Sequence, residues 1–304
     1  MKIRVKVQYV LFYNLCRLLG YLPAWFLYYP LAELVYFFLY RVARYRVKVT
    51  RENLYNSFPN KNKRELRKVE RQYYRHLSEV FIDTVDLTGI SKKQLAKRMH
   101  FLNEEEHRCE TDGMDWIAAT AHYGSWEYFM AYALGDPAGR ELTGVYRPLH
   151  TQAVDMLYRK LRSRMGMVPV SVNVLLRHII RNRRDGIKMT LGLISDQSPY
   201  WFDIERWFNF LNQPTGFFHG MEDIAVRFGM PVYFVHISKI RRAHYELWFE
   251  KIYDGKEKTE PYEITGRYVN RLEKMIEERP ELWMWSHRRW KHKPKDQEES
   301  KTDN

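Results

Sequence analysis

One histidine of the chain has the setting of a reactive group. His122 ends the apolar run 116–121, and the chain then passes through Gly124 and Ser125 to Glu127. A neutral imidazole can take a proton from a hydroxyl that attacks an acyl carbonyl, and a carboxylate on its other ring nitrogen fixes the tautomer and stabilises the imidazolium. We therefore predict His122 as a general base oriented by Glu127. A hydrogen-bonded structural histidine is the alternative.

The spacing from His122 to Glu127 carries little information without its context. Among the 11 histidines, the same spacing to an acid occurs three more times, at His100, His107 and His150. Those three lie in a charged connector or at the start of a predicted helix, whereas a strand before His122 would display it where open α/β sheets bind ligands. Ser125 lacks the Gly-x-Ser-x-Gly pattern of a nucleophilic serine, so we expect a loop or cap role for it and no covalent acyl-enzyme.

Three further segments place polar groups where a substrate could bind. Arg147 directly follows the apolar run 143–146, and its planar donor fork suits a phosphate or carboxylate. Another acid and an amide follow the run 189–194, and near the carboxyl terminus cations alternate with indole rings. The alternatives are a surface salt bridge, a helix cap and plain packing of arginine on tryptophan. The predicted substrate-binding residues are Arg147, Asp196, Gln197, His287, Arg288 and Arg289.

Elements of two kinds alternate after residue 101. Short apolar runs predict strands, and longer amphipathic stretches predict helices. This alternation indicates an α/β fold with a layered, mixed sheet flanked by helices and a hairpin at 241–244. Earlier in the chain, 60–87 predicts an amphipathic helix that packs on the main domain. The predicted strands are 116–121, 143–146, 168–170, 189–194, 232–237 and 245–249, and the predicted helices are 126–134, 151–165, 174–184, 220–228 and 263–278.

The first 50 residues are apolar with basic flanks. Their longest charge-free run, 18–32, has 15 residues and contains Gly20, Pro23 and Pro30, whereas a spanning helix needs about 20 apolar residues. Basic flanks favour the cytoplasmic side for both ends. We therefore expect a hydrophobic helical membrane anchor formed by a bent or re-entrant pair, with a single tilted span and a core-packed hairpin as alternatives. No small-residue cleavage site is present, so we expect the segment to be retained.

The charge and cysteine content limit the kinds of partner and compartment that we expect. Of the formal net charge of +13, residues 1–51 carry +8, from nine basic residues and one acid. Cations interleaved with apolar side chains favour an anionic membrane surface, where each contributes about 1 kcal/mol. A solvated basic face and a nucleic-acid site are the alternatives, and we expect no nucleic acid partner. Cys16 and Cys109 form no disulfide or zinc pattern, and no glycine-rich phosphate loop is present, so we expect a reducing compartment, no metal and no nucleotide.

Five motifs along the chain together resemble those of a known family. They are Arg51-Glu-Asn-Leu-Tyr-Asn-Ser-Phe-Pro59, His122-Tyr-Gly-Ser-Trp-Glu127, Tyr146-Arg147-Pro148, Asp196-Gln197 and Trp285-Ser-His-Arg-Arg-Trp-Lys291. The family that they resemble is the late acyltransferases of lipid A biosynthesis, within the wider lysophospholipid acyltransferase group. The resemblance covers nearly the whole chain before the tail. In two places another aromatic ring replaces the more usual Phe, at Tyr123 and Trp290, and 196–201 is unlike the Phe-Pro-Glu-Gly segment of glycerolipid acyltransferases.

The resemblance implies a glycerolipid-acyltransferase-like fold and a fatty acyl transfer. The implied donor is a phosphopantetheine thioester on acyl carrier protein, and the implied acceptor is a hydroxyl of a lipid A precursor, a phosphorylated glycolipid. It also implies His122 and Glu127 as the catalytic pair and the cytoplasmic face of the inner membrane as the location. The acidic carrier protein and the phosphorylated acceptor both fit a cationic chain.

Two other functions and a domain plan complete the predictions. A lysophospholipid or aminolipid acyltransferase could use the same centre, and a non-enzymatic membrane adaptor is a third hypothesis from a different class. We expect an anchor at 1–50, an acyltransferase domain at 51–290 and a polar tail at 291–304. The tail holds four basic and four acidic residues, so we expect it to be disordered.

Overall fold

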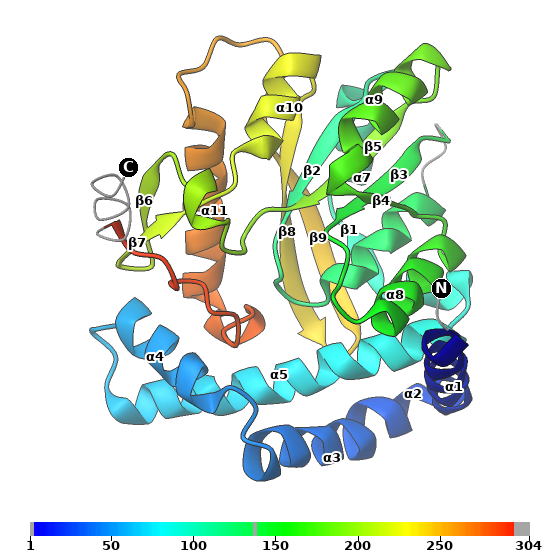
Figure 1. Ribbon diagram of the computed structural model, residues 1–304, viewed down its shortest axis with the longest axis vertical. Coiled ribbons are helices and arrows are strands. Elements are labelled where there is room, and N and C mark those ends of the chain that lie inside the picture. Colours follow the sequence, from blue (N-terminus) through cyan, green and yellow to red (C-terminus); the bar gives the residue numbers. More distant parts are fainter. Residues whose placement is uncertain (1–2, 136–138, 295–304) are drawn as a thin grey trace.

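The computed structural model describes residues 3–135 and 139–294, and a seven-stranded sheet forms its centre (Figure 1). The strand order is β1-β9-β8-β2-β5-β3-β4. The run from β8 to β4 is parallel, β9 is antiparallel to β8, and β1 is parallel to β9, so the predicted mixed sheet is confirmed. The strands are β1 (Met99–Phe101), β2 (Trp116–Thr120), β3 (Glu141–Tyr146), β4 (Val168–Ser171), β5 (Met189–Ile194), β8 (Val232–Arg241) and β9 (His244–Tyr253).

Helices cover the sheet, as the sequence predicts. Strands that are buried on both faces are continuous apolar runs, and all five residues of β2 are buried. The helix predicted over 126–134 is present, but as a 3₁₀ helix, η3 (Trp126–Leu134). The other predicted helices are α8 (Gln152–Arg164), α9 (Leu175–Arg184), α10 (Gly220–Phe228) and α11 (Glu263–Glu278).

Several elements were not predicted. They are β1, α4 (Val47–Ser57), α6 (Lys92–Ala96), α7 (Glu104–Glu110) and the hairpin of β6 (Trp207–Phe210) and β7 (Gln213–Gly216). All except α4 have too few residues to show a clear period. The expectation of a charged connector around His107 was wrong. Three acids lie in the first turn of α7, where their negative charge interacts favourably with the helix dipole. His107 is buried against the rings of Trp116 and Phe249.

The long helix α5 (Lys63–Gly89) lies across the sheet edge at which β8 ends (Figure 1). It begins at a capping box made by Asn62 and Glu65, which satisfies free amides of its first turn. Its buried face carries acids as well as apolar residues. Asp83 accepts hydrogen bonds from the hydroxyls of Ser125 and Tyr28, so the helix holds the chain three residues beyond His122.

The apolar amino-terminal segment forms a bent series of helices against α5. These are α1 (Ile3–Gly20), α2 (Ala24–Phe26), η1 (Leu27–Leu31), α3 (Ala32–Phe37) and η2 (Phe38–Val42), of which η1 and η2 are π-helical turns. Within the described residues, no single helix is long and apolar enough to cross a membrane. Together, Val5–Gly20 and Ala24–Val42 reach that length and composition, with a bend of 110° between them. The membrane anchor stays a prediction. So does the disordered tail, because residues 295–304 lie outside the described part of the chain.

We expect Asp83 to make stability depend on pH. Burial raises the pKa of Asp83 to about 7, despite the hydrogen bonds from Ser125 and Tyr28. Between its ordinary value near 4 and about 7, the folded state holds a proton that the unfolded state has lost, so this group makes stability fall as pH rises through that window. Asp83→Asn cannot ionise, so the melting temperature of this variant relative to wild type should be higher at pH 8 than at pH 5. The exposed control Asp112→Asn should show no such pH-dependent difference, and equal shifts at both pH values would contradict the assignment.

Candidate active site

The register of two parallel strands brings His122 beside Asp196. Thr120 of β2 is paired with Ile194 of β5, and His122 and Asp196 each lie two positions beyond that pair. The two chains stay together past the strands, because the Ser195 amide donates to the Thr120 carbonyl. The carboxyl edge of the sheet therefore places an imidazole and a carboxylate side by side.

Asp196 holds the His122 ring in one orientation. Oδ1 of Asp196 lies 2.7 Å from His122 Nδ1, and Oδ2 accepts the backbone amide of His122 at 3.1 Å. The carboxylate is only 2% exposed, whereas the His122 side chain keeps 19% exposure. Burial alone would raise the pKa of Asp196, but the His122 charge and hydrogen bonds from His122 and Trp283 leave that pKa below its usual value. An ionised Asp196 at Nδ1 keeps the proton there and leaves Nε2 as the basic nitrogen.

Two further side chains, one polar and one aromatic, contact the His122 ring away from Nδ1. The side-chain amide of Gln197 lies 3.2 Å from His122 Nε2, so both ring nitrogens have a side-chain partner. The Trp126 ring packs edge-on against the imidazole, with 5.0 Å between ring centroids. Asp196 and Gln197 thus both contact His122 directly. Their predicted contact with substrate stays a prediction.

The segment after His122 is fixed from several sides. The Tyr123 hydroxyl donates to the carbonyl of Met275, and the Gly124 amide donates to that of Leu282. Gly124 has a φ of +58°, and a Cβ there would lie 3.0 Å from Ile237, so both conformation and space require glycine. Ser125 donates to Asp83, consistent with the loop role expected for it. These contacts hold His122 at the strand end without any contribution from Glu127.

In the part of the chain that the structure describes, the side chain of Glu127 makes no hydrogen bond with His122, contrary to the prediction. Its carboxylate makes two hydrogen bonds with Arg162 of α8, at 3.0 and 2.5 Å, and Arg162 also lies over the rings of Tyr146 and Tyr158. The expected orienting contact to His122 is made by Asp196 in its place. The physical reason is that the Gly124 turn and the start of η3 carry Glu127 toward α8. A catalytic role for Glu127 stays a prediction.

Arg147 lies at the end of β3, as the sequence predicts, and is exposed. Its guanidinium lies over two aromatic rings, 5.1 Å from the centroid of Tyr200 and 4.5 Å from that of Phe218. Rings on its flanks restrict the side chain but leave hydrogen-bond donors for a ligand. The geometry is compatible with the phosphate contact expected for Arg147.

The carboxyl-terminal cluster divides into buried and exposed members. Arg289 is 2% exposed, donates to the Gly216 carbonyl and lies over the Phe217 ring, and burial lowers its pKa to about 10. Burial also lowers the pKa of His287 to about 4, and its Nδ1 has no hydrogen-bond partner within the described residues. Arg288 is exposed. Their predicted contacts with substrate stay predictions.

Three structural residues, Trp283, Asn53 and Asp83, were not predicted from the sequence. The indole Nε1 of Trp283 donates to Asp196 Oδ2 at 2.9 Å, and Asn53 of α4 donates to the carbonyls of Trp285 and His287. Asn53 lies in the motif 51–59, so that motif positions the carboxyl-terminal segment. An acid in the buried stripe of an amphipathic helix was the available signal for Asp83. No sequence signal singles out Trp283 from its neighbours.

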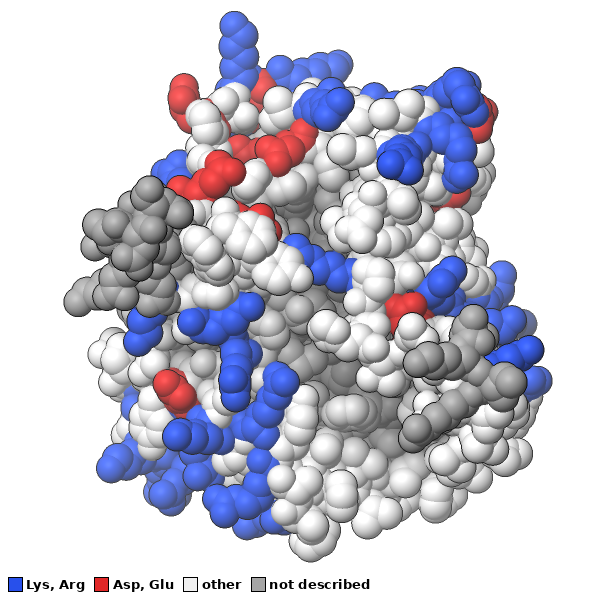
Figure 2. Space-filling model, viewed as in Figure 1, with Lys and Arg blue, Asp and Glu red and all other residues white. Residues whose placement is uncertain are grey.

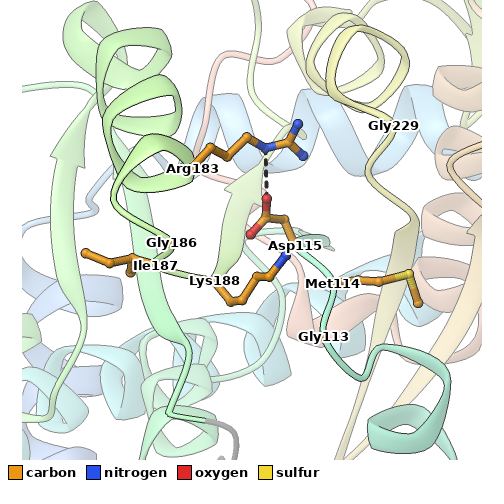
Figure 3. A pocket seen from close by; sticks show the side chains of 8 residues that line it. All are labelled: Gly113, Met114, Asp115, Arg183, Gly186, Ile187, Lys188 and Gly229. Carbon is orange, nitrogen blue, oxygen red and sulfur yellow. Dashed lines mark hydrogen bonds and ion pairs between the residues drawn. The ribbon is translucent and has the colours of Figure 1, made fainter.

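Another pocket lies at the opposite edge of the sheet, near the starts of β2 and β5 (Figure 3). It has a volume of about 350 Å³. Its acid, Asp115, is already paired with Arg183 at 2.8 Å and accepts the Met189 amide at 3.0 Å. This pocket therefore offers a satisfied ion pair and no free base. Across the part of the chain that the structure describes, no group of three or more metal-ligating side chains could hold a metal ion.

We expect Trp283 to act on Asp196 through its indole N–H. Trp283→Phe keeps an aromatic ring but removes one hydrogen bond that holds the Asp196 carboxylate in place, so kcat should fall, by less than in a variant that removes the carboxylate itself. The pKa of Asp196 should rise, which moves the acidic limb of the pH–rate profile to higher pH. The control is Trp285→Phe, because the Trp285 indole donates to the Pro280 carbonyl instead. Equal effects of the two substitutions would exclude a specific role for Trp283.

The fold and the site define an α/β protein with a histidine held by a buried carboxylate at the carboxyl edge of its sheet. The model of the bacterial lipid A biosynthesis acyltransferase family matches residues 2–292, and the chain belongs to that family. It is therefore an acyltransferase of lipid A biosynthesis, of EC class 2.3.1, and not a non-enzymatic adaptor. Family membership implies a lipid A-type substrate. A comparison with curated proteins found no match.

Proposed function

We propose that this acyltransferase moves a fatty acyl chain from acyl carrier protein to a hydroxyl of a lipid A precursor. The observation that carries the proposal is the His122 ring, oriented through Nδ1 by a buried carboxylate and partly exposed at the strand end. A base of this kind suits direct attack by an acceptor hydroxyl. Direct attack needs no nucleophilic side chain, and the Ser125 hydroxyl already donates a hydrogen bond to Asp83.

The proposed reaction has two proton transfers. The acceptor hydroxyl replaces the Gln197 amide at His122 Nε2 and attacks the thioester carbonyl while Nε2 takes its proton. Asp196 stabilises the imidazolium that forms, by charge and by its hydrogen bond at Nδ1. The C–S bond of the tetrahedral intermediate then breaks, and the imidazolium returns the proton to the departing thiolate. The products are an ester and the free phosphopantetheine thiol.

Cationic and polar groups after β3 and in the carboxyl-terminal segment support a phosphorylated acceptor. Arg147 and Arg288 are exposed, and His287 has an unpaired Nδ1 within the described residues. The net charge of +13 also favours an acidic carrier protein, because complementary charge raises association rates.

Exposed apolar side chains support attachment of the amino-terminal helices to the cytoplasmic face of the inner membrane. Apolar patches on a folded protein mark interaction sites, and here the patch follows α1 to η2. In Figure 2, Lys and Arg gather over α4 and the first half of α5, beside a largely uncharged area over α3 and α1. The exposed aliphatic, Phe and Trp side chains of this segment are Val7, Val10, Leu11, Phe12, Leu15, Leu18, Leu22, Trp25, Phe26, Leu34, Phe37, Phe38 and Val42.

Product mass tests the proposal. The purified chain is incubated with an acyl carrier protein thioester and an equimolar mixture of a lipid A precursor and a lysophospholipid. We expect the lipid A precursor to gain one ester-linked acyl group and the carrier to release one thiol per ester formed. Acylation of the lysophospholipid alone would favour the alternative acceptor, and an acyl group that stays on the protein would contradict direct transfer. Acyl coenzyme A in place of the carrier thioester tests the donor.

A further inference from the structure

A cationic groove lies between α3 and α5, formed by elements that do not contain His122 or its partners. Its volume is about 730 Å³. The α5 side presents cations at steps of three and four residues, so they share one helical face. The α3 side presents two aromatic rings. The groove is lined chiefly by Tyr36, Phe37, Arg41, Lys68, Arg71 and Arg75.

The positive charge of the groove is largely uncompensated. Arg71 and Arg75 are like charges one turn apart, a spacing that destabilises a helix. Arg75 approaches Glu33 at 3.6 Å, with both side chains about half exposed. Lys68 and Arg71 make no hydrogen bond or ion pair with any residue that the structure describes. An anion bound in the groove would relieve this repulsion.

The other wall of the groove identifies the class of anion. Phe37 lines the groove and is 56% exposed, and its neighbours Leu34 and Phe38 are 62% and 57% exposed. A ligand that places a phosphate against α5 would therefore lay its remaining part on apolar side chains. This combination of phosphate and hydrocarbon describes a phospholipid, whereas an acidic protein would leave the phenylalanines against polar surface.

We propose that the groove between α3 and α5 binds the phosphate headgroup of an anionic phospholipid and so sets the orientation of the protein on the membrane. The proposal rests on the proposed membrane attachment and adds a defined headgroup site to it. A phosphate held by Arg41, Lys68 and Arg71 would bring the exposed face of α3 against the hydrocarbon. This orientation turns the cationic face of α5 toward the bilayer surface.

Vesicle sedimentation of the full chain tests the site without turnover. The groove variant is Arg41→Gln/Lys68→Gln/Arg71→Gln, and the matched control is Arg177→Gln/Lys256→Gln/Lys258→Gln, which removes three exposed cations from α9 and the loop before α11, at the other end of the molecule (Figure 1). Vesicles of phosphatidylcholine alone are compared with vesicles that also contain phosphatidylglycerol. Because each cation near an anionic surface contributes about 1 kcal/mol, the groove variant should lose roughly tenfold or more in affinity for anionic vesicles.

The expected pattern is specific in three respects. The groove variant should bind neutral vesicles as wild type does, the control should bind both vesicle types as wild type does, and acyl transfer to a detergent-dispersed acceptor should be unchanged in both. Equal losses in the two variants, or none in the groove variant, would overturn the proposal. A groove variant with normal vesicle binding but a raised KM for carrier thioester or lipid acceptor would assign the groove to that substrate instead. A chain that binds anionic vesicles but transfers no acyl group would overturn the proposed function and leave the groove standing.

Discussion

His122→Ala is expected to lower kcat for acyl transfer by about 10²- to 10⁴-fold, the usual contribution of a positioned general base. The substitution removes the nitrogen that takes the hydroxyl proton and leaves the remaining substrate contacts in place. Binding of the acceptor should therefore change much less than kcat. The measurement is single-turnover transfer from carrier thioester to lipid acceptor, with the melting temperature determined in parallel.

The sequence offers a matched control for this experiment. His100 has an acid five positions later, as His122 does, but it is exposed on β1. His100→Ala should keep wild-type activity. Because His122→Ala leaves the buried Asp196 carboxylate without one partner, His122→Gln is a second variant that can still donate an amide hydrogen bond to Asp196. Wild-type rates in either His122 variant would refute the proposed base.

Local patterns were sufficient to predict most of the fold. Strand β5 and helices α10 and α11 lie at their predicted positions, because each is long enough to show its apolar period or run. The short α7 and the β6–β7 hairpin were missed for lack of that length. Strand order was also not predictable, since the pairing of β2 with β5 joins residues more than 70 positions apart.

The sequence predicted most residues of the site, but not which of them contact one another. His122 and Asp196 were each placed at a strand end by the same reasoning, yet nothing local indicates that those two strands are neighbours. The spacing along the chain predicted Glu127 as the partner of His122, whereas the pairing of neighbouring strands makes Asp196 its partner. A sequence motif identifies which residues lie near a reactive histidine, but the register of the sheet decides which of them contacts its ring.

The buried acids of α5 illustrate the other limit of pattern reading. Asp83 and Asp86 lie on the same helical face as apolar core residues, where an ionised group is costly unless it is paired. Their partners, among them Tyr28, Arg98 and Tyr128, come from three distant segments. An acid in an apolar stripe is thus a visible signal of a polar network, although the residues that complete the network are known only from the fold.

Asp196→Asn is expected to lower kcat by about 10²- to 10⁴-fold, because an amide can bond to the ring in the wrong tautomer and does not stabilise the imidazolium. Coupling with His122 separates this role from that of Glu127. If Asp196 acts through His122, adding Asp196→Asn to His122→Ala should cost little more. Glu127→Gln, which disturbs the pair with Arg162, should add its own full effect to His122→Ala. The reverse pattern, with Glu127→Gln non-additive and Asp196→Asn additive, would mean that Glu127 orients the ring when substrate is bound.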